Sequence, residues 1–191
     1  MLPKRVGYLT VVCGPMYAGK TTELARHQRR ARLGNLKTVI FRSKTDTRYA
    51  GLVTTHDATQ IDSETITTDW EQSHRDDIKS GVRFIGLDEA QFFPSRMISD
   101  VLHWVQQGIT VVAAGLDLTF DGMPFGVMPA LMAHANEVVK LTAVCQRCKS
   151  QEGTRTFRTS GETSLVLVGA QAHYEARCAA CWHEGLGAQA P

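Results

Sequence analysis

Residues 14–21 carry the clearest chemical signature of the sequence, Gly-Pro-Met-Tyr-Ala-Gly-Lys-Thr. They match G-x-x-x-x-G-K-[ST] at every fixed position, which is the pattern of a phosphate-binding loop. Glycine is needed there because the backbone turns with positive φ and brings its N–H groups around a polyphosphate. In such a loop the lysine reaches the β- and γ-phosphates and the hydroxyl binds Mg²⁺. The sequence therefore predicts a nucleotide site made by Gly14, Pro15, Met16, Tyr17, Ala18, Gly19, Lys20 and Thr21.

A pair of carboxylates, Asp88 and Glu89, follows the apolar run Phe-Ile-Gly-Leu at residues 84–87. Carboxylates at the carboxyl end of a parallel strand face the crevice in which this class of fold holds its nucleotide. Asp88 is then expected to hold Mg²⁺ and Glu89 to take a proton from the attacking group. The alternative is a solvated acidic strand end, which the neighbouring phosphate loop disfavours.

A polar stretch over residues 42–63 contains Asp46, Thr47, Arg48 and Tyr49. A loop of this length inside a compact domain is more typical of a lid than of a packed element. An arginine there could offset charge on a transferring phosphoryl group. Residue type alone favours the alternative, a solvated loop arginine.

Four of the five cysteines form two Cys-x-x-Cys pairs, Cys145/Cys148 and Cys178/Cys181, with 29 residues between them. This spacing indicates a closed, structural zinc site with four thiolate ligands. The alternative is redox-active pairs, which we disfavour because neither pair is expected to open a helix after a strand, as a thioredoxin motif does. The fifth cysteine, Cys13, ends an apolar run and is expected in the core.

Five basic residues lie between or beside these pairs, and a basic zinc ribbon can bind nucleic acid. Glutamates dilute their charge and few aromatic residues alternate with them. We therefore expect a solvated face and no nucleic-acid partner. The residues are Arg147, Lys149, Arg155, Arg158 and Arg177.

Elements that could position these groups alternate along the first two-thirds of the chain. Strands are predicted over residues 6–13, 37–41, 82–88 and 110–115, and helices over 21–33, 69–79 and 94–107. Strands separated by single helices favour parallel pairing. After residue 140 no helix-length periodic segment is recognised. Runs at 154–158 and 163–168 are predicted to form a hairpin between the cysteine pairs, and residues 187–191 a frayed tail.

Composition agrees with a globular chain. Apolar residues make up 43% of the 191 residues and charged residues 21%, which argues against disorder, collagen and coiled coil. The net charge of +2 argues neither for nor against a polyanionic partner. Apolar stretches are too short to cross a bilayer and the N-terminal pattern does not fit a signal peptide, so we expect no membrane association and a cytoplasmic protein.

Taken in order, the motifs resemble the zinc-containing, cytosolic P-loop thymidine kinases. The resemblance covers nearly the whole chain. It rests on Gly-Pro-Met-Tyr-Ala-Gly-Lys-Thr-Thr-Glu-Leu from residue 14, Asp-Thr-Arg-Tyr from 46, Asp-Glu-Ala-Gln-Phe-Phe from 88, Pro-Phe-Gly from 124, Lys-Leu-Thr-Ala-Val-Cys from 140 and Tyr-x-x-x-Cys-x-x-Cys from 174.

The family implies an α/β fold: a RecA-like P-loop domain with a mainly parallel sheet over residues 1–141, and a small C-terminal zinc-ribbon (lasso) module over 142–191. It implies transfer of the γ-phosphoryl of ATP to the 5′-hydroxyl of thymidine, and also of deoxyuridine. Glu89 is then the general base, and Asp88 and Thr21 serve Mg²⁺. Residues that match the ATP and active-site region are Asp46, Thr47, Arg48 and Gln91; those that match the thymidine pocket are Phe120, Leu165, Val166, Leu167, Val168, Gly169 and Tyr174.

The resemblance also implies a homotetramer that is inhibited by dTTP. Met16, Phe92 and Phe120 could form an apolar wall for the thymine methyl group. Ala172 and Ala179 depart from the family pattern, which affects the loop over the base and leaves phosphoryl transfer untouched. Two rival functions are a P-loop ATPase in which Glu89 activates water, and a zinc ribbon that binds nucleic acid under control by ATP.

Overall fold

The computed structural model describes residues 6–43, 65–68, 81–160 and 173–189. Its centre is a six-stranded sheet with the order β3-β2-β4-β5-β1-β6, in which every neighbouring pair is parallel. The strands are β1 (Leu9–Cys13), β2 (Lys37–Ser43), β3 (Thr65–Thr68), β4 (Val82–Asp88), β5 (Thr110–Gly115) and β6 (Glu137–Lys140). The predicted α/β class and parallel pairing are confirmed.

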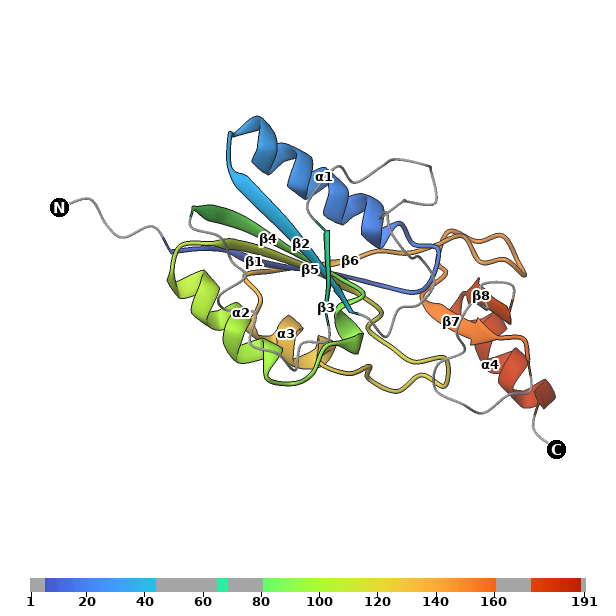
Figure 1. The fold of residues 1–191 in the computed structure, drawn as a ribbon. Coiled ribbons are helices and arrows are strands. Elements are labelled where there is room, and N and C mark those ends of the chain that lie inside the picture. Colours follow the sequence, from blue (N-terminus) through green and yellow to red (C-terminus); the bar gives the residue numbers. More distant parts are fainter. Residues whose placement is uncertain (1–5, 44–64, 69–80, 161–172, 190–191) are drawn as a thin grey trace.

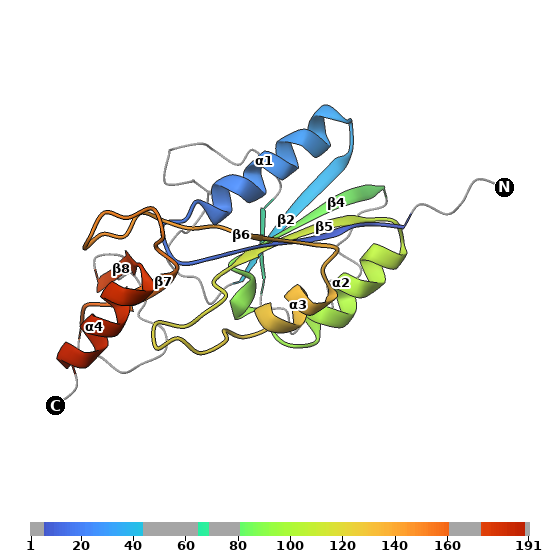
Figure 2. The same ribbon diagram turned by 180° about the vertical axis from the view of Figure 1, so that it is seen from behind.

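Helices cover both faces of this sheet, as Figures 1 and 2 show from opposite sides. Helix α1 (Lys20–Leu33) lies on one face, and α2 (Met97–Gln106) and α3 (Met128–His134) lie on the other. Because successive residues of a strand point to opposite faces, the apolar runs of the central strands fill two cores. Val12 packs with Leu24 of α1 on one face, and Val11 packs with Met97 and Leu131 of α2 and α3 on the other.

A second, smaller unit follows residue 140 and lies beyond the carboxyl ends of the strands (Figure 1). Strand β7 (Arg155–Arg158) pairs antiparallel with β8 (Tyr174–Arg177), and helix α4 (Ala179–Gln189) packs against both. Trp182 of α4 is buried. We call β7, β8 and α4, with the cysteines that precede and join them, the C-terminal unit.

The predicted strands at 82–88 and 110–115 are confirmed at both ends. Strand β1 starts at Leu9, later than predicted, and β2 runs on to Ser43, so Arg42 and Ser43 are buried strand residues rather than loop. The predicted helix at 69–79, most of the polar stretch and the hairpin strand at 163–168 lie outside the described residues.

Strand β7 pairs with β8 among the described residues, and its predicted hairpin with residues 163–168 stays a prediction. One C-terminal prediction was wrong. Helix α4 occupies a stretch in which no helix was predicted and includes part of the expected frayed tail, up to Gln189. Its sequence, Ala-Ala-Cys-Trp-His-Glu-Gly-Leu-Gly-Ala-Gln, holds two glycines and little apolar periodicity, so packing rather than propensity stabilises it. The short α3 and β6 were also not predicted. Among the described residues, no helix is long and apolar enough to cross a bilayer.

Candidate functional site

The predicted phosphate-binding loop, residues 14–21, joins β1 to α1, and its glycines have the expected positive φ. Gly14, Tyr17 and Gly19 all have positive φ, and α1 begins at Lys20, so its first N–H groups open toward the loop. A Cβ on Gly14 would lie 2.4 Å from the Leu141 carbonyl oxygen, so this position accepts no other residue. Lys20 donates from Nζ to the carbonyl oxygen of Pro15 at 2.7 Å, which holds the ammonium group across the loop.

Asp88 lies at the end of β4 and is only 2% exposed. Its Oδ1 accepts hydrogen bonds from the Thr21 hydroxyl and from the Glu89 backbone N–H, both at 3.2 Å. Its Oδ2 forms an ion pair with Arg42. The structure therefore brings Thr21 and Asp88 together, as the sequence predicted for a metal-binding pair.

Arg42 was missed, because it was assigned to the polar loop. Strands β2 and β4 are neighbours, and Arg42 stands directly opposite Asp88 in their register. Arg42 is 5% exposed, and the ion pair compensates the Asp88 charge in the low-dielectric end of the sheet. The signal that could have found it is an arginine directly after the apolar run Val-Ile-Phe, at the same strand end as the carboxylate.

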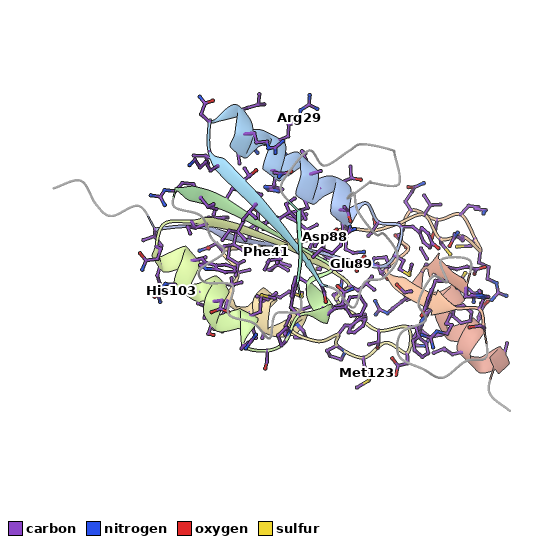
Figure 3. All side chains as sticks on the ribbon, in the orientation of Figure 1. Arg29, Phe41, Asp88, Glu89, His103 and Met123 are labelled. Carbon is purple, nitrogen blue, oxygen red and sulfur yellow. The ribbon has the colours of Figure 1, made fainter. Side chains whose placement is uncertain are left out.

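Glu89 adopts the left-handed conformation, with φ 53° and ψ 46°, directly after the strand. This is strained for a residue other than glycine, and strain of this kind concentrates at functional sites. Figure 3 shows Asp88 and Glu89 at the end of the sheet that faces the C-terminal unit.

Gln91 orients the Glu89 carboxylate. Its Nε2 donates to Glu89 Oε2 at 2.6 Å, and its Oε1 accepts from the Leu116 N–H at 3.0 Å. Gln91 is 3% exposed, and a Cβ on Gly115 would lie 2.6 Å from its Oε1, so glycine at 115 makes room for it. Sequence reasoning expected Gln91 in the active-site region; its direct partner is the glutamate.

Phe120, Arg158 and Tyr174 form a stack beside the C-terminal unit. The Arg158 guanidinium lies 3.7 Å from the ring centroid of Phe120 and 5.1 Å from that of Tyr174, and it donates to the Tyr174 hydroxyl at 2.5 Å. Phe120 and Tyr174 come from segments 54 positions apart in the sequence, and the fold brings them to one side chain.

The expectation of a solvated basic face was wrong for Arg158 and for Arg177. Arg158 is 2% exposed. Arg177 lies 3.4 Å over the Phe157 ring and pairs with Glu175 at 2.7 Å. Both arginines occur on short strands next to aromatic residues, and stacking on a ring suits the planar guanidinium.

Two hydrogen bonds join the phosphate-binding loop directly to the C-terminal unit. The Met16 N–H donates to the Thr156 hydroxyl oxygen at 3.1 Å, and the Tyr17 hydroxyl donates to the Tyr174 carbonyl oxygen at 3.1 Å. The Trp182 indole N–H extends this connection, because it donates to the carbonyl oxygens of Phe120 and Thr156 at 3.1 and 3.2 Å. Trp182 was not among the predicted site residues.

The four paired cysteines meet in space. Their sulfur atoms all lie within 4.8 Å of one another, and Cys148 Sγ is 3.7 Å from Cys178 Sγ. A tetrahedral zinc ion with Zn–S bonds of about 2.3 Å separates its sulfur ligands by about 3.8 Å, so this donor set fits zinc.

Electrostatics of the cluster favour a bound cation. Although burial opposes ionisation of Cys145, backbone hydrogen bonds from Cys148, Cys178 and Arg147 lower its pKa to about 6. Hydrogen bonding to Cys178, together with burial, raises the pKa of Cys181 to about 12. The thiols cannot all ionise at neutral pH without positive charge between them, and a dication supplies it.

One argument used against redox-active pairs was wrong, although the cluster of four sulfur atoms is compatible with zinc. The second pair does open a helix after a strand, since Cys178 directly follows β8 and Cys181 lies in the first turn of α4. What favours a metal is the presence of the other pair within ligand distance. His183, a conceivable substitute ligand, is exposed and not part of the cluster.

Several predicted site residues are not placed. Asp46, Thr47 and Arg48 lie outside the described residues, and so do Leu165, Val166, Leu167, Val168 and Gly169. Phe92, considered as part of an apolar wall with Met16 and Phe120, packs edge-on against Phe125 at 5.5 Å.

Comparison with known proteins identifies relatives over almost the full chain. A family model described as thymidine kinase matches residues 7–182. A thymidine kinase of Bacteroides fragilis is 39% identical over 184 residues, which cover 96% of this chain and 90% of the relative. Thymidine kinases of Bdellovibrio bacteriovorus and Mycoplasma mobile are 41% and 36% identical, over 90% and 94% of this chain and 83% and 88% of their own lengths.

Proposed function

The chain belongs to the thymidine kinase family, and from this premise we propose that it transfers the γ-phosphoryl group of ATP to the 5′-hydroxyl of thymidine, giving dTMP and ADP. The observation that carries the proposal is the arrangement of Glu89. Its carboxylate is held by Gln91 beside the Asp88–Thr21 pair, at the mouth of the phosphate-binding loop. In a nucleoside kinase this is the place for a group that activates a hydroxyl.

ATP binds, in this proposal, along residues 14–21. The backbone N–H groups of the loop and the start of α1 surround the phosphates, and Lys20 neutralises charge on the β- and γ-phosphates. To reach them its ammonium group leaves the Pro15 carbonyl oxygen, its partner in the structure described here. Asp46, Thr47 and Arg48 line the same region by family resemblance.

Mg²⁺ is held by Thr21 and Asp88, whose oxygens are hard ligands of the type this ion prefers. The ion neutralises charge on the phosphates when it is bound. Arg42 keeps the Asp88 carboxylate turned toward Thr21 by holding its other oxygen.

Phosphoryl transfer is in line. The 5′-oxygen of thymidine attacks the γ-phosphorus, Glu89 accepts the hydroxyl proton, and the bond to the β-bridging oxygen breaks to release ADP. Gln91 fixes the carboxylate so that the oxygen facing the substrate is defined. Most of the rate enhancement comes from positioning and electrostatics.

Thymidine binds, in this proposal, between the phosphate-binding loop and the C-terminal unit. Phe120 and Tyr174 contact the nucleoside, and Leu165, Val166, Leu167, Val168 and Gly169 cover the base by family resemblance. Deoxyuridine is a second substrate, since it differs from thymidine only by the methyl group.

The chain divides, in this proposal, into a P-loop domain over residues 1–141 and a zinc module over 142–191. The six-stranded sheet ends at Lys140, and all four clustered cysteines follow it. A structural zinc ion held by Cys145, Cys148, Cys178 and Cys181 stabilises the module. We further propose a cytoplasmic homotetramer under feedback inhibition by dTTP, as the family resemblance implies.

The test is ADP release from Mg-ATP with and without thymidine, with other nucleosides in parallel. Release that depends on thymidine, with stoichiometric dTMP, is the expected result. Equal release without any nucleoside would point instead to an ATPase in which Glu89 activates water. Salt-dependent binding of DNA or RNA without nucleoside phosphorylation would favour the nucleic-acid reading.

A further inference from the structure

Arg158 is the charged side chain of the C-terminal unit that is most deeply buried in the structure. It lies at the end of β7 and stands opposite Tyr174 in the register of β7 and β8. Its 2% exposure is unusual for a cation, and a buried guanidinium is retained only where its surroundings compensate the loss of water.

Two aromatic residues supply part of this compensation. The guanidinium lies 3.7 Å over Phe120, which is van der Waals contact with the face of the ring, and this face is the negative part of the ring quadrupole. From the same group, Nη2 donates to the Tyr174 hydroxyl oxygen at 2.5 Å. One planar group thus sets the positions of two rings that come from different parts of the chain.

The hydrogen bond also defines what the Tyr174 hydroxyl can do. Arginine can only donate, so the phenol oxygen is the acceptor and the phenol proton points to another group. The phenol proton can therefore be donated to an acceptor of a bound molecule, such as a carbonyl or hydroxyl oxygen.

Phe120 and Arg158 are also fixed with respect to each other by their backbones. The Trp182 indole N–H bridges the carbonyl oxygens of Phe120 and Thr156, and Thr156 is two residues before Arg158 on β7. The Met16 N–H donates to the Thr156 hydroxyl, which ties this strand to the phosphate-binding loop. A change in the stack therefore moves aromatic rings close to the ATP site while the backbone frame remains.

We infer that Arg158 is a positioning residue for nucleoside binding, which holds the Phe120 ring and the Tyr174 hydroxyl in the orientation that the nucleoside requires. This rests on the proposed function, since it assumes that Phe120 and Tyr174 contact the nucleoside. Arg158 itself acts through these two side chains.

The test compares Arg158→Lys and Arg158→Gln with the wild-type enzyme. Lysine keeps the positive charge but lacks the planar guanidinium group with its several N–H donors. Glutamine keeps a planar group with N–H donors but is neutral. Each variant should raise the Kd and KM for thymidine about tenfold, through misplaced rings, while the KM for ATP stays unchanged. The zinc content and the thermal midpoint should stay close to the wild-type values.

A double-mutant cycle with Tyr174→Phe separates positioning from general stability. If Arg158 acts through the Tyr174 hydroxyl, its replacement should cost much less in the Tyr174→Phe background than in the wild type. Arg155→Lys is the matched control, because Arg155 lies on the same strand and donates to the adjacent Thr154 carbonyl. It should leave the thymidine KM unchanged.

The outcomes are distinct. An unchanged thymidine Kd in both Arg158 variants would overturn the inference, and so would a parallel rise of both KM values. Loss of zinc or of folding in both variants would also overturn it, since Arg158 would then be structural. Failure of the wild-type enzyme to phosphorylate thymidine would overturn the proposed function instead.

Discussion

The carboxyl end of the six-stranded sheet, with the loop at residues 14–21, Asp88 and Glu89, is here called the phosphate end. It and the C-terminal unit are stabilised in different ways. The loop at residues 14–21, Asp88 and Glu89 stand on a parallel sheet with an apolar core on each face. The C-terminal unit has two strands of four residues and one helix. A two-stranded ribbon of this size is marginal by itself in water.

Polar and aromatic contacts between segments, rather than a large apolar core, stabilise the C-terminal unit. The sulfur atoms of four cysteines lie within 4.8 Å of one another, the Trp182 indole N–H donates to two carbonyl oxygens, and Arg177 stacks on the Phe157 ring. Damage to these contacts should therefore affect nucleoside binding and local order, while damage at the phosphate end should affect chemistry. The experiments below test this separation.

Loss of the metal should have the largest effect. In Cys145→Ser the sulfur cluster is broken, so zinc content should fall from one ion per chain toward zero. Loss of a structural metal belongs to the most damaging single changes, and for a chain of this size the thermal midpoint should fall by roughly 10 °C. Thymidine-dependent turnover should disappear while ATP binding remains, as measured by metal analysis, thermal unfolding and nucleotide titration.

Cys13→Ala is the control for this experiment. Cys13 is buried in the core and burial raises the pKa of its thiol to about 11, so it is no thiolate ligand at neutral pH. It should keep one zinc ion per chain. A Cys145→Ser variant with wild-type thermal midpoint and thymidine KM would show that the C-terminal unit needs no metal.

Glu89→Gln should show the next largest effect, at the phosphate end. The amide cannot accept the hydroxyl proton, so kcat should fall about 10²- to 10⁴-fold with unchanged ATP affinity. Single-turnover kinetics with thymidine and ATP titration measure both quantities. Glu152→Gln, at an exposed position, is the matched control. Near wild-type kcat in Glu89→Gln would exclude Glu89 as the base.

Arg42→Met tests whether the phosphate end is held by its ion pair as well as by its core. Removal of one partner leaves the Asp88 charge buried, and the expected loss in free energy of unfolding is about 3 kcal/mol. This value is at the low end of the cost expected for removing one partner of a buried ion pair. The Thr21 hydroxyl and the Glu89 N–H still donate hydrogen bonds to the Asp88 carboxylate in the variant. Urea unfolding measures the loss.

Replacement of Arg26, which is exposed, by Met is the control for the same charge change. Its ion pair with Glu23 is at the surface, so stability should change little. If Arg42→Met is as stable as Arg26→Met, the Arg42–Asp88 pair contributes nothing to the phosphate end.

Tyr17→Phe should have the smallest effect, because it removes one hydrogen bond between the two regions. The Tyr17 hydroxyl donates to the Tyr174 carbonyl oxygen near the surface, and a bond of this kind contributes about 0.5 kcal/mol. The thymidine KM should therefore rise about twofold with little change in kcat, as measured by steady-state kinetics. A fall in kcat with unchanged KM would mean that Tyr17 serves phosphoryl transfer rather than the link.

Local patterns predicted the phosphate end well. The glycine spacing, the apolar strands and the acidic strand end are properties of adjacent residues, and the structure places Thr21 beside Asp88 as these patterns indicate. Arg42 was not recognised as a site residue, because its role depends on which strand lies beside β2. Local periodicity does not predict the order of strands in a sheet.

The C-terminal unit was harder to predict. The Cys-x-x-Cys spacing predicted its cluster of four cysteines, since the spacing within each pair is a local pattern. Helix α4 carries Gly185 and Gly187 and was missed, because its stability comes from Trp182 and from packing against β7 and β8.

Residue types and spacing alone predicted the glycine-rich loop, the carboxylate pair, the four-cysteine cluster and the parallel α/β class, because each appears as a pattern of residue types along the chain. Only the tertiary structure decided that Arg42 neutralises Asp88, that Gln91 holds Glu89 and that Arg158 lies buried against Phe120 and Tyr174. These contacts join segments that are far apart in the chain or depend on a strained backbone. The free energy that makes an arginine buried rather than solvated comes from partners that only the folded chain brings to it.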